Sequence, residues 1–247
     1  MPKQELLVRN LKVSFSTSEK ELIAVRGISY QLNQGETLAL VGESGCGKTV
    51  SALSILRLIE EPPGKIISGE ILFDDKDLLK LTKKELQDHR GKDIAMVFQN
   101  PMTSMNPVLT IGEQIIETLL RHTPLSRKEA KEKSLKLLEQ VEISSPKEKL
   151  DQYPHQLSGG MRQRAMIAMA LACSPRILIA DEPTTALDVL IQAQILDLLK
   201  KIKKETQMSI LLITHDLGVV AEIAKRVMVM YAGEIVETGP VRDLFRS

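Results

Sequence analysis

A glycine-rich segment at residues 42–49 has the residue types and spacing of a phosphate-binding loop. It reads Gly-Glu-Ser-Gly-Cys-Gly-Lys-Thr and fits the pattern G-x-x-x-x-G-K-[ST]. Glycines let the backbone wrap closely around phosphate oxygens, and consecutive N–H groups at a helix start attract anions. Lys48 would neutralise charge on the β- and γ-phosphates, and the Thr49 hydroxyl would ligate Mg²⁺. The segment predicts a nucleoside triphosphate site made by Gly42, Glu43, Ser44, Gly45, Cys46, Gly47, Lys48, Thr49 and Val50.

Two adjacent carboxylates, Asp181 and Glu182, follow a short apolar run at residues 177–180. Ligands of open α/β sheets bind at the carboxyl ends of the strands, so Asp181 would hold Mg²⁺ there. Glu182 would then be placed to polarise an attacking water. Strands also end in acidic turn residues that have no catalytic role. The pair is predicted to be catalytic only because the phosphate-binding loop is present in the same chain.

Five short apolar runs are continuous rather than alternating, which is typical of strands covered on both faces. The phosphate-binding loop follows the first run, and the apolar stretch at residues 50–60 after it predicts a buried helix. We therefore expect a mainly parallel sheet with helices on each side. The five runs lie at residues 37–41, 94–98, 177–180, 210–213 and 227–230.

Two further kinds of segment differ from these runs. Residues 6–15 and 70–73 have mixed polarity and turn residues nearby, which favours an antiparallel edge layer. Residues 110–157 have few strand-like runs and a helical pattern, which predicts a helical sub-domain inserted between two strands. One apolar stripe of that segment consists of Ala130, Leu137, Leu138 and Val141.

The composition is that of an ordinary globular protein and argues against several functions. The chain has 247 residues, of which 43% are hydrophobic and 26% charged, and its net charge of +1 gives no field to attract nucleic acid. Its first residues lack the apolar core of a signal peptide, and no apolar run reaches the ~18 residues that cross a bilayer. Two distant cysteines, Cys46 and Cys173, fit a reducing compartment. Any membrane association is therefore expected to go through protein partners.

The segment Leu-Ser-Gly-Gly-Met-Arg-Gln-Arg at residues 157–164 resembles the signature motif of ATP-binding cassette (ABC) ATPases. As a bare string it also fits a loop that caps a helix. In that family two cassettes pack head-to-tail, and each signature caps the nucleotide held by the other's phosphate-binding loop. Ser158, Gly159 and Gly160 precede a predicted helix at residues 161–172, whose positive end would face a γ-phosphate.

Other parts of the family pattern follow in order over essentially the whole chain, and the resemblance implies a role for each. Gln99 resembles the Q-loop glutamine that senses Mg²⁺ and the transmembrane partner, and the segment ending at Asp188 resembles the D-loop that connects the two sites. His215 resembles the switch histidine that contacts the γ-phosphate. Phe15 resembles the aromatic that stacks on adenine, with Val25 on the ribose side. A strand-end phenylalanine is more often part of a core.

Finer features resemble one branch, the oligopeptide, dipeptide and nickel importer ATPases. They are the sequence from Phe98 to Pro107, the Tyr-Pro-His-Gln before the signature, and the Asp-Glu-Pro-Thr-Thr-Ala-Leu-Asp-Val that begins at Asp181. In that family the loop after Gln99 helps to receive the permease. The resemblance implies two transmembrane permease subunits, a second ATPase subunit, with a heterodimer preferred and a homodimer possible, and an indirect solute-binding protein outside the cytoplasm.

Two features depart from that branch. Its chains usually continue beyond the position of Ser247 with a C-terminal extension, which in some members carries a cysteine cluster for iron–sulfur. Cys46 stands where serine is common. Its thiol would lie among backbone N–H groups at a helix start, which predicts an acidified thiol that reagents can alkylate.

The predicted fold is α/β, with a P-loop NTPase (RecA-like) core of mainly parallel sheet, an antiparallel β edge layer and an inserted α-helical sub-domain. One ABC ATPase domain would span residues 1–247. Its nucleotide-binding core would be residues 1–100 and 166–247, and its helical signature sub-domain residues 101–165.

The predicted function is ATP hydrolysis that energises an importer, at the cytoplasmic face of the cell membrane as a peripheral subunit. The predicted catalytic residues are Glu182, His215 and Lys48. The residues predicted to bind Mg²⁺ are Thr49, Gln99 and Asp181. Oligopeptides or dipeptides are the favoured solutes, with nickel, metal chelates or haem as the alternative. A soluble ABC ATPase without a transporter, or one that acts on nucleic acid or the ribosome, fits the sequence less well.

Overall fold

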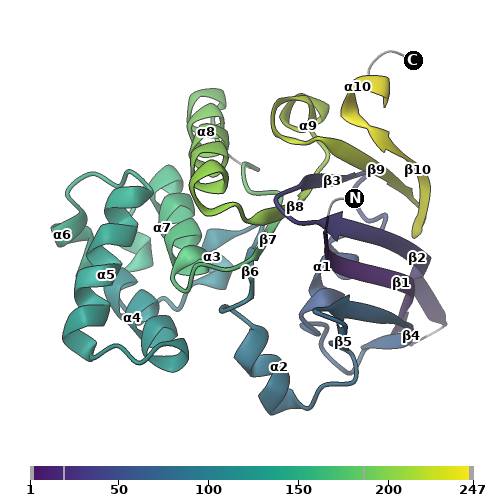
Figure 1. The fold of residues 1–247 in the computed structure, drawn as a ribbon, viewed down its shortest axis with the longest axis horizontal. Coiled ribbons are helices and arrows are strands. Elements are labelled where there is room, and N and C mark those ends of the chain that lie inside the picture. The colour runs from purple at the N-terminus through teal and green to yellow at the C-terminus, as the bar shows by residue number, and fades with distance from the viewer. Residues whose placement is uncertain (1–2, 19, 186, 245–247) are drawn as a thin grey trace. The chain divides into compact units, whose positions relative to one another are not determined.

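The computed structural model describes residues 3–18, 20–185 and 187–244, which fold as two compact units (Figure 1). The first unit comes from both ends of the chain, Met1–Gln87 and Gln207–Ser247, and the second is Asp88–Thr206. These bounds differ from the division expected from the sequence. Two strands of the parallel type, at residues 94–97 and 177–181, belong to the same unit as the helical segment.

An antiparallel sheet forms one part of the first unit. It has the strand order β2-β1-β4-β5, and the central strand β1 pairs antiparallel with both β2 and β4. Apolar side chains of β1, including Val8 and Val13, are completely buried on its inner face. The expected antiparallel edge layer is thereby confirmed. The strands are β1 (Gln4–Ser16), β2 (Glu21–Asn33), β4 (Gly64–Phe73) and β5 (Lys76–Asp77).

Parallel strands form the other part of the first unit. β3 pairs parallel with both β8 and β9, and β10 adds an antiparallel edge to β9. All residues of β3 and β8 are buried, as their continuous apolar sequences predict. Helices α9 and α10 contribute Val220 and Val241 to a core cluster with Ala39, Val41 and Val227 of these strands. The elements are β3 (Thr37–Val41), α1 (Lys48–Ile55), β8 (Ser209–Thr214), α9 (Leu217–Ile223), β9 (Arg226–Tyr231), β10 (Glu234–Pro240) and α10 (Val241–Leu244).

Helix α1 is shorter than the sequence indicates. The apolar stretch predicts a helix to residue 60, but α1 ends at Ile55, although its Ala52 and Ile55 are completely buried as expected. Arg57 adopts a left-handed conformation with φ of 48°, and its N–H donates to Ser54. The N–H of Leu58 donates to the carbonyl of Leu53 at 2.9 Å. This is a Schellman motif, which closes a helix regardless of how apolar the following residues are.

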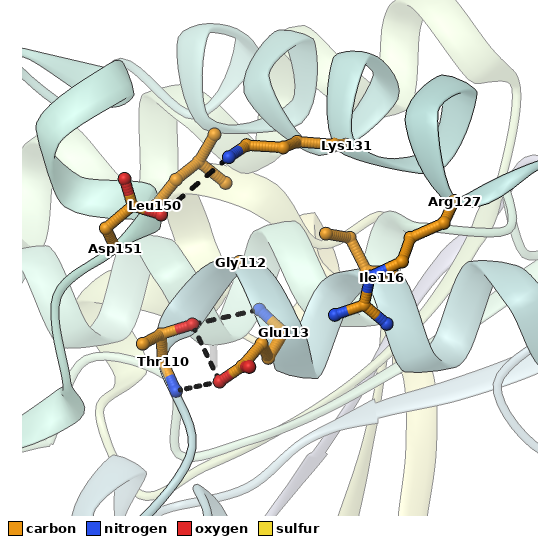
Figure 2. Close-up of a pocket in the computed structure, with 8 residues that line it drawn as sticks. All are labelled: Thr110, Gly112, Glu113, Ile116, Arg127, Lys131, Leu150 and Asp151. Atoms are coloured by element: carbon orange, nitrogen blue, oxygen red, sulfur yellow. Dashed lines mark hydrogen bonds and ion pairs between the residues drawn. The ribbon is translucent and has the colours of Figure 1, made fainter.

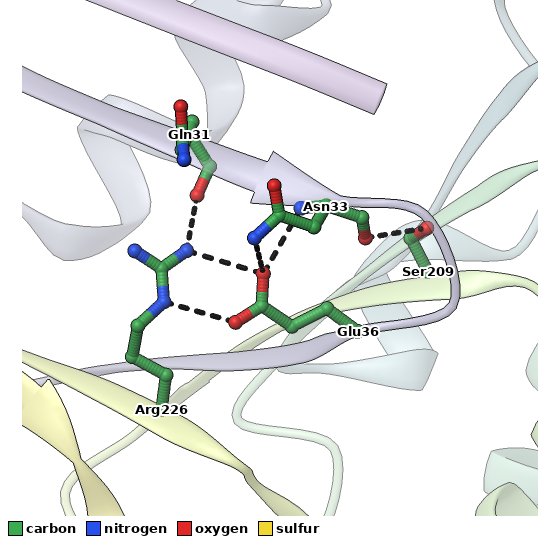
Figure 3. A network of polar contacts seen from close by, with 5 residues as sticks. All are labelled: Gln31, Asn33, Glu36, Ser209 and Arg226. Atoms are coloured by element: carbon green, nitrogen blue, oxygen red, sulfur yellow. Dashed lines mark hydrogen bonds and ion pairs between the residues drawn. The ribbon is translucent and has the colours of Figure 1, made fainter. Parts of the chain in front are cut away.

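A polar network ties the antiparallel sheet to the parallel strands within the first unit (Figure 3). Arg226, at the start of β9, donates from Nε to Glu36 Oε1 at 2.9 Å and also donates to the carbonyl of Gln31 on β2. Glu36 also accepts from the backbone and side chain of Asn33. Ser209, at the start of β8, donates to the Asn33 carbonyl at 3.2 Å. The turn between β2 and β3 is therefore fixed against β8 and β9.

The second unit combines two parallel strands with a group of helices. β6 pairs with β7, with Val97 opposite Ala180, and β6 ends at Val97 rather than at the expected Phe98. The predicted stripe lies on α5 and the residue after it, and all four of its side chains are buried. The elements are β6 (Ile94–Val97), α3 (Pro101–Ser104), α4 (Ile111–His122), α5 (Arg127–Gln140), α6 (Pro146–Leu150), η1 (Pro154–Gln156), α7 (Gly159–Leu171), β7 (Ile177–Asp181) and α8 (Val189–Thr206). Helix α2 (Lys83–His89) contains the boundary between the units.

Helices α4, α5 and α6 enclose a small cavity of about 230 Å³ (Figure 2). At its rim Thr110 and Glu113 form a capping box that starts α4. Lys131 of α5 reaches to within 4.0 Å of Asp151, just after α6. Of the polar contacts drawn around this cavity, the capping box therefore lies within the start of α4, and the ion pair joins α5 to the residue after α6. No helix among the described residues is long and apolar enough to cross a membrane.

We predict that Glu36→Gln lowers the free energy of unfolding by about 1–2 kcal/mol at pH 7, because the charged hydrogen bonds to Arg226 are lost. Burial raises the pKa of Glu36, but hydrogen bonds from Arg226 and Asn33 outweigh it and hold that pKa below its ordinary value. The stabilisation is therefore complete above the unfolded-state pKa of about 4.3 and is lost as the pH falls through the lower folded-state pKa.

Urea unfolding of wild type and Glu36→Gln between pH 7 and pH 3 measures the difference in free energy of unfolding and its loss at low pH. Glu70→Gln is the matched control, because Glu70 makes only an exposed ion pair with Arg9 and weaker contact with Lys80. An equal loss of stability in both variants would contradict the assignment of the network as the tie between the sheets.

Candidate nucleotide-binding site

The phosphate-binding loop lies between β3 and α1, as the sequence predicts. A Cβ atom on Gly47, whose φ is 107°, would lie 2.5 Å from the Ala24 carbonyl oxygen and 2.9 Å from Met230 Cε. A Cβ on Gly42 would overlap the Met230 carbonyl oxygen. The loop is therefore packed directly against backbone of β2 and β9, and only glycine fits at these two positions.

The side chain of Lys48 is held within the phosphate-binding loop by hydrogen bonds to backbone carbonyls. Its side chain is buried, and its Nζ donates to the carbonyl oxygens of Gly42 at 2.8 Å and Glu43 at 2.9 Å. These are neutral acceptors, so phosphate oxygens can replace them with a gain in charge attraction. Thr49, Glu43, Ser44 and Gly45 are exposed, and Val50 is half-buried.

Cys46 is less accessible than the sequence indicates. Only 8% of this residue is exposed, and its Sγ lies 3.9 Å from Lys48 Nζ. A Cβ on Gly42 would contact the same sulfur at 2.8 Å. The thiol fills space under the loop, so burial limits the predicted alkylation.

His215 lies in the same unit as the phosphate-binding loop. It follows β8 and is exposed, while the next residue, Asp216, caps α9 by accepting from Gly218 N at 2.7 Å. His215, Gly42 and Glu43 line one cavity of about 490 Å³. The apolar walls of this cavity include Leu217 and Val229. The structure thus brings the predicted switch histidine beside the start of the loop.

The two residues expected around the base and ribose differ in accessibility. Phe15 lies at the end of β1, opposite Leu22 of β2, and its ring is only partly buried. Val25 is completely buried in the same sheet. A ribose contact through Val25 therefore stays a prediction that would require its side chain to become exposed, whereas Phe15 offers ring surface.

Three predicted residues lie together in the second unit. Asp181 ends β7 and is buried, Glu182 follows it, and Gln99 comes just after β6. Because β6 and β7 are parallel neighbours, their carboxyl ends bring these residues to one edge. Gln99 Nε2 donates to Glu182 Oε2 at 2.9 Å. The predicted base and the predicted Q-loop glutamine are therefore already in contact.

Thr185 is a member of this cluster that sequence reasoning did not identify. Its hydroxyl donates to Glu182 Oε2 at 2.8 Å, and its backbone N–H donates to the Glu182 carbonyl at 3.1 Å. Glu182 has a φ of 45°, which is uncommon for a residue with a side chain. The spacing of three residues between an acid and a threonine in a turn is the only signal that the sequence offers.

The signature residues form the start of α7. Ser158 caps the helix by accepting from Met161 N at 3.3 Å, so its own hydroxyl proton can be donated to a ligand. Gly159 and Gly160 are the first helical residues, two positions earlier than the predicted helix start. Asp188 caps α8 by accepting from Ile191 N at 2.9 Å. Signature and D-loop residues line one cavity of about 470 Å³; Ala186 lies outside the described residues.

The chemistry of the donors fits Mg²⁺ bound with a nucleotide. Thr49, Asp181 and Gln99 offer a hydroxyl, a carboxylate and an amide oxygen, the hard ligands that Mg²⁺ prefers. Among the described residues no group of three or more His, Cys, Asp or Glu side chains could hold a metal ion alone.

Comparisons with known proteins identify the family. The family model described as ABC transporter matches residues 25–185. The oligopeptide transport ATP-binding protein OppD of Bacillus subtilis is 56% identical over 240 residues, which are 97% of this chain and 67% of the relative. The dipeptide transport ATP-binding protein DppD of the same organism is 57% identical over 97% of this chain and 72% of its own length. This chain belongs to the ABC transporter family.

Solved structures agree with the fold. A dimeric post-hydrolysis state of the ATP-binding cassette MJ0796, bound to ADP and Pi, matches with a TM-score of 0.86 and 29% identity over 96% of this chain and 99% of that one. CbiO1 of Clostridium perfringens, part of the transporter complex CbiONQ, also matches, with a TM-score of 0.81 and 27% identity over 99% of this chain and 92% of that one. The predicted P-loop NTPase fold is confirmed, and the protein is an ABC ATPase.

We predict that Gly47→Ala abolishes ATP binding, because the added Cβ would force the loop away from Ala24 and Met230. Titration with a fluorescent ATP analogue measures the affinity, and circular dichroism reports whether the variant is folded. Gly239→Ala is the matched control, since a Cβ there meets nothing within 4 Å. Wild-type affinity in Gly47→Ala would show that the loop does not need this close approach.

Proposed function

We propose that this protein binds and hydrolyses ATP to energise an importer of oligopeptides or dipeptides. The observation that carries the proposal is the identity of 56% and 57% to OppD and DppD of Bacillus subtilis over 97% of the chain. The site supports it, because the phosphate-binding loop, the paired carboxylates and the signature each have the local geometry that their proposed roles require.

In this proposal ATP is held by the residues that the sequence motifs assign to it. The Phe15 ring stacks on adenine, the backbone of the phosphate-binding loop binds the phosphates, and Lys48 exchanges its carbonyl acceptors for phosphate oxygens. Thr49, Asp181 and Gln99 would hold Mg²⁺, which would neutralise charge that develops on the phosphates. Gln99 suits this role because its Nε2 is already bonded to Glu182, which leaves its amide oxygen to face a metal.

Hydrolysis begins with Glu182. Its carboxylate accepts hydrogen bonds from Gln99 and Thr185, which fix its direction, and it orients and deprotonates a water that attacks the γ-phosphate. His215 contacts the γ-phosphate from beside the start of the loop. The charge lost when phosphate leaves weakens the interactions that hold two cassettes together, so the dimer can open.

A second cassette completes each site. Ser158 and the backbone N–H groups at the start of α7 present a hydroxyl donor and a positive helix end, both suited to a γ-phosphate. We propose that they face the nucleotide of a partner cassette, and the dimeric form of the similar MJ0796 cassette supports this arrangement. A heterodimer with a second ATPase subunit is the preferred assembly, and a homodimer is the alternative.

The loop that follows Gln99 is the proposed contact with two transmembrane permease subunits. It exposes Met102, which lies in the short helix α3 that Asn100 caps, and it exposes 75% of Val108 beyond that helix. Exposed apolar residues on a well-formed loop suit a protein partner. The protein would then lie at the cytoplasmic face of the membrane as a peripheral subunit, with a solute-binding protein linked only through the permeases.

Affinity purification of the tagged chain from native membranes tests this assembly. Recovery of two multi-span permeases with a second ATPase subunit would support the importer. Recovery from the soluble fraction without permeases would contradict it and leave a soluble ABC ATPase.

We predict that Glu182→Gln binds ATP with wild-type affinity but hydrolyses it at least about a hundredfold more slowly, because the general base is lost. The purified assembly should therefore retain ATP after gel filtration, where wild type retains ADP or nothing. Asp197→Asn is the matched control, since Asp197 is an exposed residue of α8 that pairs only with Lys200. Full turnover by Glu182→Gln would exclude the proposed base.

A further inference from the structure

Arg164 lies on α7, six residues after the helix cap Ser158, and is 8% exposed. Its guanidinium connects three helices of the second unit. Nη1 donates to the Val141 carbonyl at 2.8 Å and to Glu142 Oε2 at 3.4 Å, and Nη2 donates to Gln194 Oε1 on α8 at 3.1 Å. A planar group with several donors can hold such acceptors at once, whereas an ammonium cannot.

Two of the acceptors of Arg164, Val141 and Glu142, lie at the C-terminal end of α5. Glu142 has a φ of 59°, its N–H donates to Glu139, and the N–H of Ile143 donates to Leu138 at 3.0 Å, which together form a Schellman motif. The Val141 carbonyl at this end carries the negative pole of α5, so a buried guanidinium stabilises it. Lys201 of α8 donates to the other oxygen of Glu142 at 3.1 Å.

The acceptor on α8 is Gln194, and the D-loop residue Asp188 directly precedes this helix. Gln194 lies on the same helix as Ile191, whose N–H is capped by Asp188. Ile191 also contacts the signature directly, since a Cβ on Gly160 would lie 2.9 Å from its Cγ2. Helices α7 and α8 therefore have two contacts near their N-terminal ends. Gly160 packs against Ile191, and Arg164 donates a hydrogen bond to Gln194.

We propose that Arg164 is a positioning residue that locks the signature at Ser158–Gly160 to the D-loop at Asp188, so that both segments meet a partner cassette as one rigid piece. This inference rests on the proposed function, in which those segments act on a nucleotide held by another chain. In this role Arg164 acts through these two segments. Its removal leaves the phosphate-binding loop of its own chain intact and misplaces the groups that it offers to the partner.

Hydrogen exchange of the isolated chain tests the lock without any need for activity. Arg164→Met should raise amide exchange in two peptides, residues 158–163 and 187–192, and leave residues 42–49 unchanged. Lys201→Met is the matched control, because it removes the other cation from Glu142 and should leave both peptides protected. Unchanged exchange in Arg164→Met, or a rise over the whole chain, would overturn the proposal.

Kinetics supply a second readout. In the assembly that hydrolyses ATP, Arg164→Met should lower kcat by about tenfold, the effect of losing a charged hydrogen bond, while KM for ATP stays nearly unchanged. Arg164→Lys should recover part of kcat, because it keeps the charge but reaches fewer acceptors. Gln194→Leu should reproduce the loss in a chain that folds. A change confined to KM would overturn the proposal.

Absence of hydrolysis by wild type would contradict the proposed function, while the exchange result still decides the role of Arg164.

Discussion

The close approach of backbone to phosphate is the constraint on which the proposed chemistry depends. A triphosphate carries several negative charges, and a short loop can surround it only if its N–H groups point inward and no side chain intervenes. Gly42 and Gly47 meet that condition because β2 and β9 leave no room for a Cβ. The same strands are fixed at their far ends by Arg226 and Glu36, so the polar network of the sheets and the shape of the loop belong to one framework.

In the proposed dimer, the second unit supplies positive groups to the phosphate held by a partner cassette. A loop and one lysine supply only part of the charge that a γ-phosphate needs in a site that excludes water, and the start of the partner's α7 would offer more. A helix end is effective only if its direction is fixed. Ser158 caps the helix and Arg164 joins it to α5 and α8, so the positive end is held in place before any ligand arrives.

Local sequence determined most of what could be predicted. The glycine loop, the continuous strands and the stripe on α5 depend on neighbours in the chain, and the structure confirms their elements. The end of α1, the burial of Val25 and the bonds of Thr185 and Arg164 could not be predicted, because they depend on a left-handed turn or on packing between distant residues. Arg164 is a clear case, since its three acceptors lie more than twenty residues away in either direction.

The central claim is that ATP hydrolysis by this chain drives the import of peptides. The most direct measurement is solute uptake by proteoliposomes that contain the assembly purified through this chain, with its solute-binding protein and MgATP. The account predicts uptake of an oligopeptide or dipeptide that stimulates hydrolysis, and loss of both with Lys48→Ala. Hydrolysis that ignores peptide but responds to nickel, a metal chelate or haem would contradict the peptide assignment, and hydrolysis that ignores every solute would contradict the importer.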